Sequence, residues 1–85
     1  MKKNIRITLI DKKGEGVCKR GHVIGESFSY DHDLGKLCPM ALHAGFPYID
    51  IIRYGGDAPK TVHGDIRFCC PDSDVINIFK IEEEK

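Results

Sequence analysis

The chain has 85 residues, and its 13 Lys and Arg residues balance 13 Asp and Glu residues, so the formal net charge is zero. This length makes one domain, residues 1–85. Zero net charge gives no general attraction for nucleic acid or for an anionic membrane, so neither is expected as a partner. Four cysteines at this length are too few for a disulfide scaffold.

The beginning of the chain lacks the pattern of an export signal. Arg6 and Thr8 interrupt the apolar positions of the first ten residues, whereas a signal peptide needs an unbroken apolar run. Nothing elsewhere approaches the ~20 apolar residues of a membrane span. These features predict a cytoplasmic protein, in which thiols stay reduced and the cysteines are free or act as ligands.

The first predicted strand covers residues 4–10. Ile5, Ile7 and Leu9 alternate with polar positions, which is the period-2 pattern of a strand with one buried face. Residues 11–16 follow as a charged turn that contains glycine.

A second strand is predicted over residues 23–30, with a bulge at the glycine within it. Ile24, Phe28 and Tyr30 are expected to share one face of this strand. Residues 31–36 then form a polar loop.

Residues 39–54 are the only predicted helical segment. Pro39 suits the first helical position, and apolar residues recur after it at helical spacing. Pro47 lies inside this segment and is expected to bend the helix or break it in two. Gly55 and Gly56 are expected to end the helix in a left-handed cap.

Two strands are predicted in the C-terminal part. Ile66, Phe68 and Cys70 share one face of the first strand, a turn follows at residues 71–74, and the second strand covers residues 75–81. The charged residues after it are expected to be a solvated tail.

Together these elements predict an α+β fold: a small antiparallel sheet (β-β-α-β-β) with one bent or broken helix packed on one face. So short a chain buries a limited core. A metal ion, or a partner chain such as a second copy in a homo-oligomer, would therefore add stability.

Cys18 and His22 flank a turn at Gly21 that would direct both side chains toward one point. Thiolate and imidazole are the ligands that zinc and iron sites use most, so the pair is a candidate metal-binding unit. The alternative is an exposed loop in which the glycine sets the turn and the histidine is solvated.

Cys38 directly precedes the first helical residue. A thiol there lies near the free N–H groups and the positive end of the helix dipole, which stabilise thiolate. The alternative is that Cys38 packs under the helix start as a small apolar residue, since free cysteine is among the most buried residue types.

Cys69 and Cys70 are adjacent in a predicted strand, so their side chains point to opposite faces. Cys70 shares the face of Phe68 and is expected to point inward, either as a ligand or as plain core packing. Cys69, His43 and His63 are weaker candidates for additional ligands, because nothing in their spacing directs them to the same point.

Catalytic templates are missing from the chain. It has no Gly-x-Ser-x-Gly motif, phosphate-binding loop or Gly-x-Gly-x-x-Gly motif. Cys38 and His43 would make a nucleophile and a base, but no third group is placed to orient them. Whether the protein is an enzyme stays open at this point.

Four motifs together resemble a family of short bacterial and archaeal proteins, frequent in anaerobes, that has no established activity. They are Cys18-x-x-Gly21-His22, Leu37-Cys38-Pro39-Met40-Ala41, Arg53-Tyr54-Gly55-Gly56 and Cys70-Pro71-Asp72. The resemblance covers nearly the whole chain and implies a single small α+β domain. It also favours Cys70 over Cys69, since the cysteine before Pro-Asp is the one that the motif marks.

Three functions are consistent with these patterns. The first is a metal-binding module in which Cys18, His22, Cys38 and Cys70 hold zinc or iron at one end of the sheet. The second is a domain that binds a protein or a small molecule and has structural cysteines. The third is a thiol-based redox protein or enzyme that uses Cys38 or Cys70.

Overall fold

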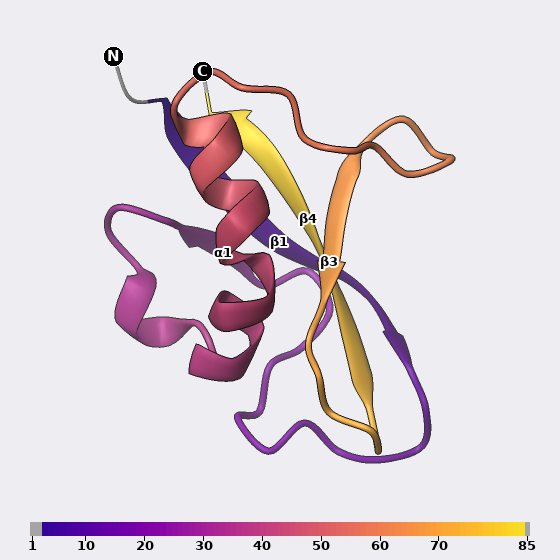
Figure 1. Cartoon of the computed structure of the whole chain (residues 1–85). Helices are drawn as coiled ribbons and strands as arrows, with labels where there is room; N and C mark the ends of the chain where they lie inside the picture. Colours follow the sequence, from indigo (N-terminus) through magenta and orange to yellow (C-terminus); the bar gives the residue numbers. More distant parts are fainter. Residues whose placement is uncertain (1–2, 85) are drawn as a thin grey trace.

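An antiparallel sheet with one helix against it makes up the computed structural model, which describes residues 3–84. The sheet has four strands in the order β2-β1-β4-β3, and α1 lies against one of its faces (Figure 1). The predicted α+β class and element order are confirmed. None of the helices in the described part of the chain is long and apolar enough to cross a membrane. The elements are β1 (Asn4–Lys13), β2 (Ser27–Ser29), a short 3-10 helix (Leu34–Lys36), α1 (Pro39–Arg53), β3 (Ile66–Cys69) and β4 (Ile76–Glu84).

β1 is longer than its alternating pattern predicts. It continues to Lys13, which pairs with Ile76 of β4. A register shift between Leu9 and Asp11 marks a bulge, beyond which the strand is exposed. The turn predicted at residues 11–16 therefore begins later, because pairing with β4 satisfies the backbone of this charged segment.

β4 also continues, through residues predicted to be a solvated tail. Glu82 and Glu84 pair with the first residues of β1. Arg6 Nη2 lies 2.7 Å from Glu84 Oε1, and such cross-strand ion pairs offset the repulsion within this acidic run. The tail prediction is wrong for residues 82–84, and Lys85 lies outside the described residues.

The second strand is much shorter than predicted. Only Ser27–Ser29 forms β2, while Val23 and Ile24 are 65% and 58% exposed. Gly25 has a φ of +98° and donates its N–H to Leu9 O at 2.8 Å, so the chain turns here before it can pair as a strand. The prediction that Ile24 shares a strand face with Phe28 is therefore wrong, since Phe28 is buried and Ile24 lies outside β2.

The helix α1 begins at Pro39 and is continuous through Pro47. Of the two outcomes expected at Pro47, division into two helices does not occur. Ala41, Gly45 and Ile49 are spaced four residues apart and form the buried stripe that packs on the sheet.

The C-terminus of α1 is closed by the two glycines, as predicted. Gly55 has a φ of +84°, and the Gly55 and Gly56 N–H groups donate to Ile52 O at 3.0 Å and Ile51 O at 2.8 Å. These are the two hydrogen bonds of a Schellman cap.

Gly55→Ala is expected to lower the free energy of unfolding by about 1 kcal/mol, because an L side chain is strained at positive φ. Nothing lies within 4 Å of the added methyl, so backbone strain alone is measured. Urea denaturation against Gly35→Ala, a position with open space and no positive φ, provides the matched control. An equal effect of the two substitutions would contradict the cap.

The core lies between α1 and the inner face of the sheet. Phe68 and Phe79 stack with ring centroids 5.1 Å apart on neighbouring strands. The alternation predicted for the first strand is confirmed by burial, and β4 shows the same alternation up to Ile81. The residues of the core cluster are Ile5, Ile7, Leu9, Phe28, Leu37, Ala41, Ile49, Phe68, Phe79 and Ile81.

Candidate thiol pocket

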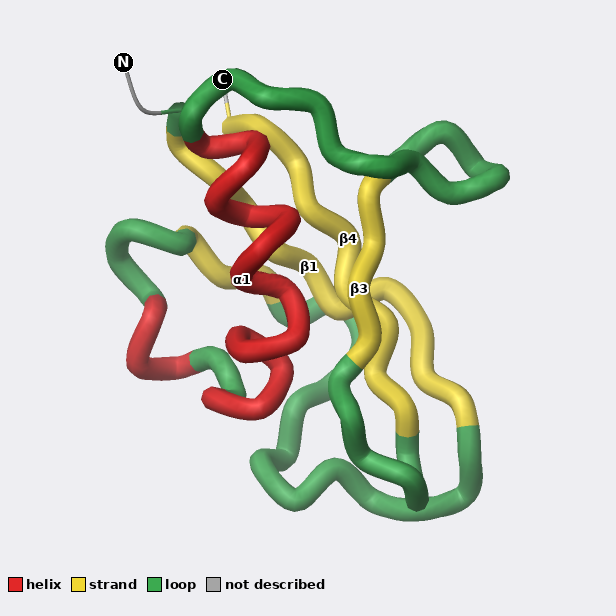
Figure 2. Tube along the Cα trace, in the orientation of Figure 1, coloured by secondary structure: helices red, strands yellow, loops and turns green. Residues whose placement is uncertain are grey.

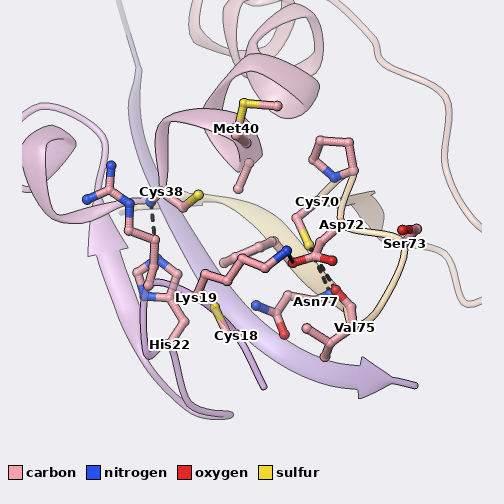
Figure 3. Close-up of a pocket in the computed structure, with 14 residues that line it drawn as sticks. Cys18, Lys19, His22, Cys38, Met40, Cys70, Asp72, Ser73, Val75 and Asn77 are labelled. Carbon is pink, nitrogen blue, oxygen red and sulfur yellow. Dashed lines mark hydrogen bonds and ion pairs between the residues drawn. The ribbon is translucent and has the colours of Figure 1, made fainter. Parts of the chain in front are cut away.

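Three segments far apart in the chain meet around a cavity of about 420 Å³. The loop after β1 passes beside the β3–β4 turn (Figure 2), where Gly16 N–H donates to Asp74 O at 3.2 Å. The start of α1 closes a third side (Figure 3). Each of the four residues singled out as primary ligands lines this cavity: Cys18, His22, Cys38 and Cys70.

Cys18 is the first residue of a tight turn that places backbone N–H groups near its sulfur. Gly21, at a φ of +75°, donates its N–H to Cys18 O at 3.0 Å and closes the turn. Burial raises the pKa of the Cys18 thiol, but hydrogen bonds from the N–H groups of His22, Arg20 and Gly21, and from the Asn77 side chain, together lower this pKa below its ordinary value. The turn therefore favours thiolate at Cys18.

His22 is a buried link between this turn and the helix, and it is 7% exposed. Its Nε2 accepts the Cys38 N–H at 3.1 Å, so the ring proton is on Nδ1, which donates to Glu26 Oε1 at 2.9 Å. The ring also packs edge-on against Phe28 and Phe79. Both nitrogens are committed to hydrogen bonds, so His22 positions the Cys18 turn and is not a free ligand in this arrangement.

Cys38 occupies the N-cap position of α1, but its side chain does not cap the helix. The sulfur points into the cavity (Figure 3). Cys38 is partly buried and packs against the core cluster while it also lines the cavity, which agrees with the alternative of a small apolar residue under the helix start. Its backbone is held by the His22 bond, which couples its position to the Cys18 turn.

Cys70 is held within the β3–β4 turn. Its sulfur accepts the Asn77 N–H at 3.2 Å and donates to Val75 O at 3.6 Å. These two bonds suit a neutral thiol, and they leave Cys70 less available than Cys38. Cys69 is exposed on the opposite side of the strand, as the alternation predicts.

Charged groups lie at the edge of the cavity. Lys19 Nζ is 3.6 Å from Asp72 Oδ2 and 3.9 Å from Asp74 Oδ2, and its side chain stretches toward Asp72 in Figure 3. The Asp74 N–H, assisted by Lys19, lowers the pKa of Asp72. Arg20 adds a second, exposed cation to the lining.

Asn77 is a cavity residue that the sequence reasoning missed. It is 2% exposed, and its Oδ1 has no hydrogen-bond partner among the described residues. The sequence signal that could have identified Asn77 is its polar side chain at an inward position of the last strand, between the apolar residues Val75 and Phe79. An unpaired buried acceptor is costly, so a ligand with an N–H or O–H group would satisfy it.

The secondary candidates do not line this cavity. Cys69 is on the other face, and His63 lies exposed in the loop between α1 and β3. His43 lies beside a separate open groove on α1 with Leu42 and Phe46.

The cavity thiols surround a space and do not converge on a single point. Across residues 3–84, no three Cys, His, Asp or Glu side chains are grouped closely enough to hold a metal ion. A zinc site places sulfur at ~2.3 Å from the ion, so the thiols would have to move closer together to form one.

Comparison with known proteins gives no information about the chemistry of this cavity. No protein-family model, curated protein or solved structure matches this chain.

Proposed function

We propose that this protein binds a small molecule in the thiol-lined cavity, with the Cys18 thiolate as its principal contact. The observation that carries the proposal is that Cys18, Cys38 and the buried, unpaired Asn77 oxygen line one cavity of about 420 Å³. A cavity of this size suits a small organic ligand. The thiolate form is the nucleophilic form of cysteine, so the contact is able to become covalent.

Other cavity residues support this function. Cys38 presents a second sulfur that does not serve as a helix cap. Asn77 contributes an unpaired acceptor, and Lys19 and Arg20 contribute positive charge. Asp72 and Asp74 offset the charge of Lys19. A soft nucleophile, an acceptor and the Arg20 cation in one cavity favour a polar ligand that bears an anionic group.

Zinc or iron remains the second candidate. The observation that favours it is that Cys18, Cys38 and Cys70 line one cavity. Iron–sulfur centres are held by thiolates whose potential depends on N–H···S hydrogen bonds, and Cys18 and Cys70 both accept such bonds. This function requires the Cys70 sulfur to give up its bond to Val75 O.

Alkylation kinetics test the first candidate. With iodoacetamide followed by peptide mapping, Cys18 is expected to react faster than Cys69, although Cys69 is the more exposed thiol. The lowered pKa at Cys18 shifts its rate profile to lower pH than in the unfolded protein, because thiolate is lost only as the pH falls through the folded-state pKa. Cys18→Ser should remove the fast phase and Cys69→Ser should leave it. Equal rates at both thiols, or labelling of Cys18 only after unfolding, would refute the proposal.

Chelation distinguishes the two candidates. A small-molecule pocket predicts that protein purified without a His tag keeps its melting temperature when a chelator is added. A metal site predicts a clear fall, since ligands from three separate segments link binding to folding. If the chelator lowers the melting temperature of the wild type but not that of Cys18→Ser or Cys38→Ser, the metal site is supported.

A further inference from the structure

We infer that the cavity ligand is a low-molecular-weight disulfide derived from an amino acid or short peptide, with which Cys18 and then Cys38 exchange. The inference rests on the proposed function, since it names the chemical class of the ligand of the same cavity. Four features carry it: the position of Cys18 and Cys38 on one cavity, the free Asn77 oxygen, the basic residues at the edge and the direction of the Cys38 sulfur.

The recognition groups match the parts of such a molecule. A disulfide sulfur is the soft electrophile that a thiolate attacks. An amide or ammonium N–H of the ligand would satisfy Asn77 Oδ1, which lacks a partner among residues 3–84. A carboxylate would meet Arg20, and Lys19 where it lies between Asp72 and Asp74.

The first step forms a mixed disulfide at Cys18. The Cys18 thiolate attacks one sulfur of the ligand disulfide, a new S–S bond forms, and the ligand S–S bond breaks. The leaving thiolate takes the electron pair and is protonated by solvent. The N–H groups around the Cys18 sulfur favour the attacking thiolate, and this contribution disappears once the sulfur is bonded.

The second step uses Cys38. His22 joins the backbones of the two sites, because it belongs to the Cys18 turn and accepts the Cys38 N–H at 3.1 Å. The Cys38 sulfur has to move across the cavity toward Cys18; its thiol loses its proton to solvent and attacks the Cys18 sulfur, which releases the second ligand thiol. The two protein thiols are oxidised to one disulfide, and the ligand disulfide is reduced to two thiols. Cys70 is less suited to this step because its sulfur is engaged with Asn77 and Val75.

Glutathione disulfide is the probe for the two steps, followed by intact-mass analysis and peptide mapping. Wild-type protein should form an internal Cys18–Cys38 disulfide and release two glutathione molecules per chain. Cys38→Ser should accumulate a glutathione adduct at Cys18, and Cys18→Ser should form neither product. Cys69→Ser serves as the matched control and should behave as wild type. A stable glutathione adduct in the wild-type protein would overturn the Cys38 step. A Cys38→Ser protein that gives the same products as the wild type would also overturn it.

A neutral disulfide separates ligand class from general thiol reactivity. Glutathione disulfide should react faster than hydroxyethyl disulfide when each rate is normalised to that of a free thiol in solution. Lys19→Ala and Arg20→Ala, both exposed positions, should each lower the ratio of the normalised rate with glutathione disulfide to that with hydroxyethyl disulfide about two- to fivefold. Equal normalised rates would overturn the ligand class while leaving the proposed thiolate pocket standing. If Cys18 reacted with neither disulfide and did not react with iodoacetamide, both the ligand class and the proposed thiolate pocket would be refuted.

Discussion

His22→Leu should lower the free energy of unfolding by roughly 2–4 kcal/mol, the combined cost of an unpaired N–H and a lost charge-assisted bond. Leucine removes the acceptor of the Cys38 N–H and the donor to Glu26. The ring contacts with Phe28 and Phe79 are also lost, although leucine replaces part of the apolar volume. Urea denaturation in chelator-treated buffer measures this effect.

His22→Gln is the conservative control, because the Gln Oε1 lies near the position of the histidine Nε2 and still accepts an N–H. It should cost less than His22→Leu and should retain fast alkylation at Cys18. If His22 served only as a metal ligand, the metal-free protein would lose little stability with either substitution. That result would contradict the positioning role.

Gly45→Ala is the second substitution with a large expected effect, a loss of roughly 1–3 kcal/mol from overpacking. An added Cβ at Gly45 would lie 2.7 Å from Phe68 Cε1, and stacking on Phe79 holds the Phe68 ring in place. Alanine is otherwise the better helix former by about 1 kcal/mol. The sign of the change therefore decides whether packing or propensity dominates.

A double-mutant cycle identifies the cause. Phe68→Leu removes the ring atoms that the new methyl would meet, so Gly45→Ala should cost less in that background than in wild type. Thermal or urea unfolding of the four proteins gives the coupling free energy. A stabilised Gly45→Ala protein, or zero coupling, would show that α1 is able to move away from the sheet.

Local chemistry was sufficient for the parts of the fold that depend on near neighbours. The alternation of Ile5, Ile7 and Leu9 marked the buried face of β1, and these residues are buried. Pro39 and the Gly55-Gly56 pair marked the ends of α1. Each signal acts through backbone geometry or a side-chain period within a few residues, so no knowledge of the rest of the chain is needed.

Pairing partners decided the lengths of the strands. The pairing between β1 and β4 includes Lys13 of β1 and residues 82–84 of β4. Their side chains alone predict a turn and a tail. Gly25 turns the chain before β2, so the apolar Val23 and Ile24 remain exposed. Strand formation depends on a partner across the sheet, and that partner is distant in the sequence.

The sequence by itself singled out Cys18, His22, Cys38 and Cys70 as residues at the ends of predicted elements, and these four line one cavity, but it did not identify Asn77. Only the tertiary structure decided their roles. His22 forms hydrogen bonds with both ring nitrogens, the pKa of the Cys18 thiol is lowered by the N–H groups around it, and Asn77 supplies an unpaired oxygen. These roles depend on which donor faces which acceptor across segments that are far apart in the chain, and neither residue type nor spacing contains that information.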